Sequence, residues 1–213
     1  MNLQLAQLRS LISERFPAAM HIHYSQPKGA EEKSVRLWPG KLVEVVSPNL
    51  AEGAGLLLLQ LAAQAKGSLA WIDAADSLDL ASLPQGLRNR LLWLRGHGVK
   101  DSLKAADMLL RDGNLQTVFL DLRLVSEKQL ASLPSSIWHR LRMLSEKTHA
   151  AAGIFTPSAT VACAAARWSV NGRFDLASLH QEHGVLMNEL QILSQRGQGI
   201  MPADDCDGVP LQS

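Results

Sequence analysis

The stretch that decides the fold is WPGKLVEVVSPNLAEGAGLLLLQLAAQ, residues 38–64. A Trp-Pro-Gly turn leads into an apolar run, residues 41–46, which predicts a buried strand. A loop with two glycines, residues 47–55, follows, and residues 56–65 then predict an apolar helix. Strand, loop and helix in this order form a phosphate-binding loop, so the stretch predicts an α/β fold organised around such a loop.

The loop lacks the side chains that phosphate chemistry needs. An active loop supplies a lysine to the β- and γ-phosphates and a Ser or Thr hydroxyl to magnesium. One alignment places Glu52-Gly53-Ala54 at those positions, and an alignment with one more residue places Gly53-Ala54-Gly55 there. Neither supplies a cation, and each lost charge-assisted hydrogen bond is worth about 1.5–3 kcal/mol. We therefore expect no ATPase activity and no catalytic residue.

Composition sets further limits. The 213 residues are 46% hydrophobic and carry a net charge of +1, so we expect one sizeable domain. A protein dedicated to duplex DNA would show a basic excess or stripe, which is missing here. Two cysteines, no signal-peptide layout and no apolar run of about 20 residues predict a cytoplasmic protein with no membrane span.

The two ends of the chain differ from its middle. Residues 1–22 predict an N-terminal arm containing an amphipathic helix that Pro17 ends. Its apolar face is a candidate for binding a partner or a second copy of the chain, and consists of Leu5, Leu8, Leu11, Ile12 and Phe16. Residues 23–36 have the composition of a linker, residues 37–197 form the expected core domain, and residues 198–213 predict a disordered tail.

Between these ends, strands and helices alternate. The hydrophobic pattern predicts strands at 69–72, 91–94, 117–122 and 154–155, and helices at 101–112, 126–133 and 135–148. We expect Asp101 or Ser102 to cap the first of these helices and Gly113 to end it. The rhythm favours a largely parallel sheet with helices on both faces. An alternating run at 164–170 before Asn171-Gly172 then predicts a hairpin.

Other polar side chains give weaker signals. His21 with His23, and His180 with His183, lack a third ligand at metal-binding spacing, so we expect no metal site and no cofactor. Asp73, Asp76 and Asp79 are better explained by capping and a solvated face than by a carboxylate cluster. We expect His97 in a turn, and Cys163 as a small core side chain.

Several segments resemble the RecA-like recombinase domain. Residues 37–45 are similar to its Pro/Gly turn and first core strand, residues 68–74 to its next strand, and residues 117–121 to the strand that ends in a metal-side acid, here Asp121. The glutamate that activates water in active members corresponds to Ala75. The resemblance implies a three-layer α/β fold with antiparallel strands at the C-terminal edge. For that reason we assign residues 185–193, which also fit a helix, to a strand.

The remnant of the nucleotide site that this resemblance implies consists of Ser47, Asn49, Gly53, Ala54, Gly55 and Asp121. Within the superfamily, the chain resembles the ImuA family of bacterial translesion mutagenesis most in residues 36–198. The likeness rests on residues 91–95, 109–113, 141–145, 166–168 and 190–197. The SOS cell-division inhibitor SulA resembles the same core without a phosphate-binding loop. The N-terminal arm and the loop remnant favour ImuA.

The ImuA resemblance implies a non-catalytic accessory protein of SOS-induced mutagenesis. Its expected partners are RecA and an ImuB-type polymerase homologue, reached through protein contacts, with direct nucleic-acid binding weak or absent. One alternative is a SulA-like inhibitor that binds the tubulin-like division protein. The other is a weak RecA-like ATPase that uses a non-standard cation, such as Lys66 or a residue from a partner.

Overall fold

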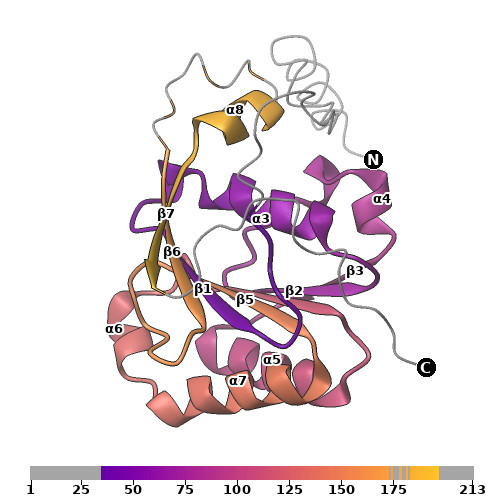
Figure 1. Cartoon of the computed structure of the whole chain (residues 1–213), viewed down its shortest axis with the longest axis vertical. Coiled ribbons are helices and arrows are strands. Elements are labelled where there is room, and N and C mark those ends of the chain that lie inside the picture. The colour runs from indigo at the N-terminus through magenta and orange to yellow at the C-terminus, as the bar shows by residue number, and fades with distance from the viewer. Residues whose placement is uncertain (1–34, 173, 175–177, 179–180, 182, 197–213) are drawn as a thin grey trace, which may run out of the picture.

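The computed structural model describes residues 35–172, 174, 178, 181 and 183–196, and its centre is a seven-stranded sheet (Figure 1). The strand order is β3-β2-β4-β5-β1-β6-β7, and every pair is parallel except β6 with β7. The strands are β1 (Leu42–Val46), β2 (Leu69–Asp73), β3 (Leu91–Arg95), β4 (Thr117–Asp121), β5 (Ala151–Thr156), β6 (Ala166–Asn171) and β7 (Gln191–Arg196).

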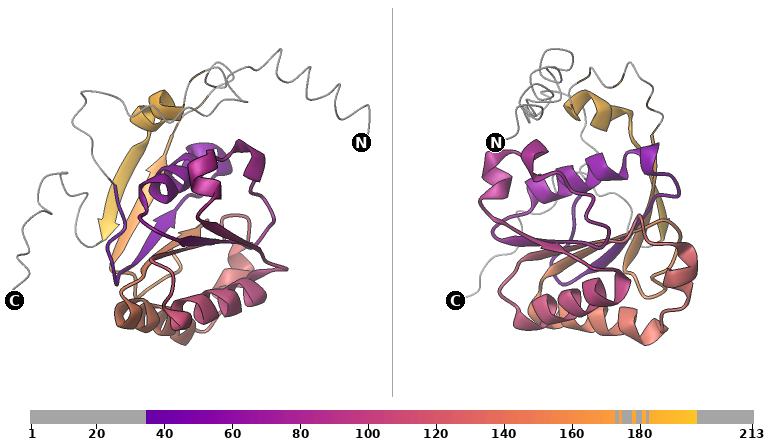
Figure 2. Two further views of the ribbon diagram at one scale, coloured as in Figure 1. Left: turned by 90° about the vertical axis from the view of Figure 1, so that its right-hand side faces the viewer. Right: turned by 180° about the vertical axis from the view of Figure 1, so that it is seen from behind.

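Helices cover both faces of the sheet, which gives three layers (Figure 2). On one face lie α3 (Ala54–Gln64) and α4 (Gln85–Arg88), and on the other lie α5 (Val99–Asp112) and α7 (Ser135–Thr148). The remaining elements are α6 (Glu127–Ala131), α8 (His183–Glu189) and the 3-10 turns η1 (Leu50–Glu52) and η2 (Leu80–Ser82). The expected mainly parallel α/β sheet with an antiparallel C-terminal edge is confirmed.

Two apolar cores, one on each face, hold the layers together. Val43 and Val45 of β1 contribute to the core under α3, while Leu42 contributes to the core over α7. Strands β1, β2, β4 and β5 are buried along their whole length, as expected for parallel strands covered on both sides. Burial of apolar surface at about 25 cal/mol per Å² is therefore the main term that stabilises the sheet.

A buried carboxylate ties three segments together on the α7 face. Glu44 of β1 is fully buried, and its Oε2 accepts a hydrogen bond from Arg167 Nε of β6 at 2.6 Å. Its Oε1 accepts from the backbone N–H groups of Thr160 and Val161 at 2.7 and 2.9 Å, and from Thr156 Oγ1 at 3.1 Å. With all these donors the charge is compensated, which a buried carboxylate requires.

Helix boundaries differ from expectation at two N-termini. Helix α3 begins at Ala54, two residues before the expected start, because Gly53 takes a left-handed conformation (φ +86°) that other residues disfavour. Helix α5 begins at Val99 after Gly98, so neither Asp101 nor Ser102 is its cap. The Ser102 hydroxyl instead donates to the Gly98 carbonyl, as hydroxyls inside helices do. Gly113 (φ +75°) ends α5 as expected.

The C-terminal edge corrects two expectations. β6 does pair with an antiparallel strand, but α8 and its connections intervene, so Asn171-Gly172 is not a two-residue hairpin turn. A Cβ on Gly172 would lie 2.9 Å from the Glu52 carbonyl and 2.5 Å from the Phe174 ring, so this glycine serves close packing. Within residues 185–193, the assignment to a strand is wrong up to Glu189, which ends α8, and correct from Gln191.

The expected arm at 1–22, all but the last two residues of the expected linker at 23–36, and the tail at 198–213 lie outside the described residues, as do Leu5, Leu8, Leu11, Ile12 and Phe16. The domain boundaries therefore stay predictions. Within the described part of the chain, no helix combines the length and the apolar character needed to cross a bilayer.

Candidate functional site

The carboxyl ends of the parallel strands meet at one edge of the sheet, where α/β folds bind their ligands. Asp73 at the end of β2 is in register with Asp121 at the end of β4. Val46, the last residue of β1, is in register with Thr156 of β5, and Ser47 follows it as the first residue of the loop. The predicted remnant residues are therefore brought together at this edge.

The loop after β1 satisfies its own polar groups. The Ser47 hydroxyl donates to the Asn49 carbonyl at 2.8 Å. The side-chain amide of Asn49 donates to Glu52 Oε1 at 2.7 Å, and the Asn49 backbone N–H donates to Glu52 Oε2 at 3.3 Å. This reciprocal pairing stabilises η1 as a capping box does. Asn49 and Glu52 thus bond to each other, and Glu52 places a negative charge in the loop.

Hydrophobic side chains lie over the middle of the loop. A Cβ on Gly53 would lie 2.8 Å from the Phe174 ring and would also collide with the Leu190 side chain. Phe174 follows β6, and Leu190 joins α8 to β7, so the C-terminal edge closes over the loop. The space above Gly53 is therefore filled by apolar atoms of the same chain.

Asp121, the expected metal-side acid, is bound by an arginine two residues later. Arg123 Nε donates to Asp121 Oδ1 at 2.9 Å, and Arg123 Nη2 donates to Oδ2 at 2.6 Å. The backbone N–H of Arg123 adds a third bond to Oδ1 at 3.2 Å. Side-chain exposure is 4% for Asp121 and 14% for Arg123, so this is a largely desolvated, two-pronged ion pair.

The same guanidinium reaches the start of helix α3. A Cβ on Gly55, in the first turn of α3, would lie 3.1 Å from Arg123 Nη1. Helix N-termini favour anions, so a cation is held there only because Asp121 and Asp73 attract it. Burial would lower the pKa of Arg123, but the hydrogen bonds and charge of Asp121, with the charge of Asp73, outweigh it and raise that pKa above its usual value. The guanidinium lies between the Asp121 carboxylate and the first turn of α3.

The Asp73 carboxylate accepts its hydrogen bonds from the loop that follows β2. Its Oδ2 accepts hydrogen bonds from the backbone N–H groups of Ser77 and Leu78, each at 2.7 Å, and its Oδ1 accepts from Ala75 N–H at 3.2 Å. Ala75, where active recombinases carry a water-activating glutamate, offers only a methyl group. Asp73 therefore shapes the turn after β2.

The other two aspartates of this segment are separate from it. Asp76 is exposed and forms a weak ion pair with Arg95 at 3.8 Å, while Asp79 accepts from Ala81 N–H at the start of η2. This agrees with capping and a solvated face. Across the described residues, no group of three or more His, Cys, Asp or Glu side chains is arranged to hold a metal.

Arg123 was not identified from the sequence, although a signal was present. Successive side chains of an extended chain alternate, so residues i and i+2 point the same way. An arginine two residues after the acidic strand end, in Asp121-Leu122-Arg123, therefore predicts an intrachain ion pair. Lys66, one alternative source of a cation, follows the far end of α3. Because α3 has 11 residues, it separates Lys66 from the loop by about 16 Å.

No protein-family model and no curated protein matches this chain. Among solved structures, one described as the crystal structure of the RadB recombinase is similar, with a TM-score of 0.51 and 13% sequence identity. The match covers 65% of this chain and 78% of that chain. At this identity the likeness shows the fold alone, and the fold is that of a RecA-like recombinase.

Proposed function

We propose that this protein is a non-catalytic RecA-like accessory protein of the ImuA kind, acting in translesion DNA synthesis through protein contacts. The observation that carries the proposal is the position of Arg123. Its guanidinium makes a bidentate ion pair with Asp121 and lies against Gly55. A nucleotide with magnesium would have to displace this guanidinium from a buried carboxylate. Breaking such a pair costs about 3–5 kcal/mol, which opposes nucleotide binding.

The sheet supplies a surface for protein partners. Strand β3 is the outer strand beside β2, so one row of its backbone N–H and C=O groups is unpaired within the sheet. Leu92 on this strand is 45% exposed, and Arg95 stacks over the Trp93 ring at 5.0 Å. Unpaired edges with apolar side chains are templates for another chain. We propose that RecA or an ImuB-type polymerase homologue is contacted through such surfaces.

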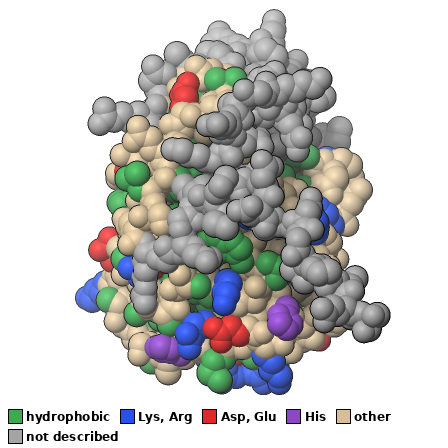
Figure 3. Space-filling view, in the orientation of Figure 1, with side chains coloured by type: hydrophobic (Ala, Val, Ile, Leu, Met, Phe, Trp, Pro, Cys, Tyr) green, Lys and Arg blue, Asp and Glu red, His purple; other side chains and the backbone are tan. Residues whose placement is uncertain are grey.

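Charge supports contacts with protein over contacts with nucleic acid. The chain has 21 basic and 20 acidic residues, and Lys and Arg side chains on the face in Figure 3 are interspersed with Asp and Glu. Nucleic-acid affinity grows with the number of phosphates that cations neutralise. Direct binding to DNA is therefore proposed to be weak or absent.

A binding assay with purified partners tests the proposal. The full chain is mixed with RecA filaments on single-stranded DNA and, separately, with an ImuB-type polymerase homologue. Saturable binding to either is expected, with loss of at least tenfold in affinity for Leu92→Asp and little change for the exposed control Met108→Asp. Absence of binding to both partners contradicts the proposal.

Two alternatives make different predictions in matched assays. A SulA-like inhibitor would bind the tubulin-like division protein and slow its polymerisation, and would not bind RecA filaments. A weak ATPase is favoured by one observation, since Arg123 could itself supply the missing cation at the start of α3. In that case Arg123→Ala would abolish magnesium-dependent nucleotide binding present in the unmodified protein.

A further inference from the structure

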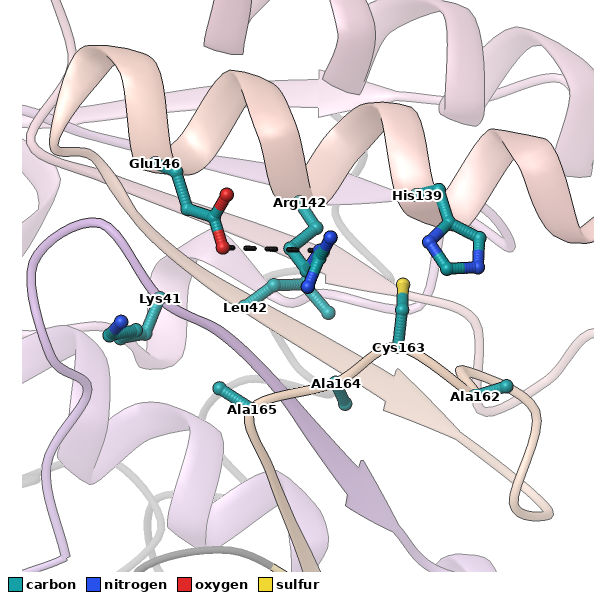
Figure 4. A pocket seen from close by; sticks show the side chains of 9 residues that line it. All are labelled: Lys41, Leu42, His139, Arg142, Glu146, Ala162, Cys163, Ala164 and Ala165. Atoms are coloured by element: carbon teal, nitrogen blue, oxygen red, sulfur yellow. Dashed lines mark ion pairs between the residues drawn. The ribbon is translucent and has the colours of Figure 1, made fainter.

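A second feature lies at the opposite end of the sheet, where β1 begins. A pocket of about 520 Å³ opens between α7 and the segment that precedes β6 (Figure 4). Figure 4 shows Cys163 pointing up toward α7, with His139 and Arg142 of that helix beside it. The lining residues are Lys41, Leu42, His139, Arg142, Glu146, Ala162, Cys163, Ala164 and Ala165.

The pocket contains more positive charge than its own acid neutralises. Glu146 is the one carboxylate in the lining, and it lies 3.9 Å from Arg142 Nε, at the limit of an ion pair. Arg142 Nε is buried without a hydrogen-bond partner, which is unfavourable for a donor of this kind. Within the described part of the chain, neither the Lys41 ammonium nor the His139 ring has an ion pair or hydrogen bond. These donors suit a carboxylate ligand.

At the C-terminal edge of the sheet, β7 ends close to this pocket. β7 runs antiparallel to β6, and its last residue, Arg196, is in register with Arg167. Ala165, in the pocket wall, lies two residues before Arg167, and its N–H donates to the Leu42 carbonyl at 2.8 Å. The end of β7 at Arg196 therefore lies near Ala165 in the pocket wall. The remaining distance is about one strand spacing and two residues, on the order of 10 Å.

The residues that follow carry the complementary charge. Residues 204–207 read Asp-Asp-Cys-Asp, and seven residues, 197–203, separate them from Arg196. Seven residues span at most about 25 Å, so the acidic segment can reach the pocket without strain. Tethering also gives it an effective concentration in the millimolar range, which allows weak carboxylate contacts to be populated.

We propose that residues 204–207 bind in this pocket, with their carboxylates on Arg142 and Lys41. Binding would satisfy the buried Nε of Arg142 and pair a charge that Glu146 reaches poorly. It would also bring Cys206 next to Cys163. These are the two cysteines of the chain, so their reaction reports the docking.

The rate of disulfide formation tests the proposal on the full chain. With glutathione disulfide as oxidant, the Cys206 thiolate attacks one glutathione sulfur and releases one glutathione. The Cys163 thiolate then attacks the mixed disulfide and releases the second, so two protein thiols lose two protons and two electrons to the oxidant. Mass spectrometry and peptide mapping should find an intrachain Cys163–Cys206 bond.

Removing the tail charges provides the decisive comparison. The variant D204N/D205N/D207N changes residues outside the described domain, and should form the bond at least tenfold more slowly. The reaction of Cys206 with glutathione disulfide is measured separately in proteins that carry Cys163→Ser. This measurement separates docking from the intrinsic reactivity of Cys206. Equal second-step rates with and without the aspartates overturn the proposal.

The pocket side is tested with a matched pair. Arg142→Gln should slow the bond at least fivefold, and Lys128→Gln, a change of the same charge on α6, should leave the rate unchanged. A bond that forms between two chains, seen as a covalent dimer whose yield rises with protein concentration, also overturns the intramolecular proposal.

Discussion

The charged side chains are well compensated at one end of the sheet and poorly compensated at the other. At the carboxyl ends of the strands, Asp121 holds Arg123 and Asp73 holds its own loop, and both carboxylates are buried. At the amino end of β1, Arg142 and Lys41 surround a pocket with little compensation. At the carboxyl ends of the strands the chain's own side chains fill the space over Gly53, whereas a pocket is open at the amino end of β1.

Under the proposed non-catalytic role, this difference gives a physical reason why the fold is stable without nucleotide chemistry. An unpaired buried carboxylate costs several kcal/mol, so an acid that no longer meets a metal needs a new partner or must be replaced. Arg123 provides that partner in this chain. The strand end is preserved because the pair stabilises it, independent of any nucleotide.

The largest expected effect comes from the buried ion pair of Glu44 and Arg167, which lies between the two ends of the sheet. Arg167→Ala removes the cation from fully buried Glu44, and the free energy of unfolding should fall by about 4 kcal/mol. Urea denaturation followed by circular dichroism measures the loss. The control Arg95→Ala removes an exposed ion pair with Asp76 and the stacking of Arg95 over Trp93, and should change stability by only about 1 kcal/mol. Equal effects in the two variants would contradict the assignment of Glu44 as a structural charge.

A somewhat smaller loss is expected at the nucleotide edge. Arg123→Ala should lower the free energy of unfolding by about 3 kcal/mol, because Asp121 keeps only backbone donors and stays near Asp73. Arg123→Lys keeps the positive charge but not the planar pair of hydrogen-bond donors, so it should lower the free energy of unfolding less than Arg123→Ala does. The raised pKa of Arg123 stabilises the folded state at every pH below the unfolded value, and this contribution is lost only as the pH rises through the folded pKa. The difference from the unmodified protein should therefore be the same at pH 6 and pH 9.

Closure of the loop predicts a third effect. Gly53→Ala places a methyl group in a left-handed conformation, against Phe174 and Leu190, and should cost about 2 kcal/mol. Gly86→Ala is the matched control, because a Cβ there meets no atom within 4 Å. In a loop that is open to ligands, Gly53→Ala would cost only the left-handed backbone strain of about 1 kcal/mol, and thermal unfolding of the two variants distinguishes this from the larger loss.

The smallest effect on stability is expected at the open end. Arg142→Gln removes a half-exposed charge with a distant partner, so the free energy of unfolding should change by less than about 1 kcal/mol. A decrease in the free energy of unfolding as large as that of Arg123→Ala would contradict the proposed difference between the two ends of the sheet.

Much of the fold followed from the sequence because its signals are local. Apolar runs such as residues 41–46 and 117–122 mark buried parallel strands, and Gly113 marks the end of α5. The start of α5 was missed because Gly98 carries no side-chain cap and the Ser102 hydroxyl bonds back into the helix. At 185–193, helical spacing and alternation coincide in one segment, and packing of α8 against α3 decides the outcome.

The candidate site could be predicted only in outline. The sequence alone showed that the loop has no lysine and no Ser or Thr at the expected positions, and that position 75 is an alanine. The filling of the loop was not visible in the sequence, because Phe174 and Leu190 come from more than 100 residues away and meet Gly53 only in the folded chain. Cys163 packs against the core as expected, but it is only half-buried and also lines the wall of a pocket.

The central claim is that the nucleotide edge is closed by its own chain, and a titration with ATP and magnesium tests it most directly. Isothermal titration calorimetry on the full chain should show no magnesium-dependent binding up to millimolar ATP, in both the unmodified protein and Asp121→Ala. Micromolar affinity in the unmodified protein, with turnover that Asp121→Ala abolishes, would contradict the account.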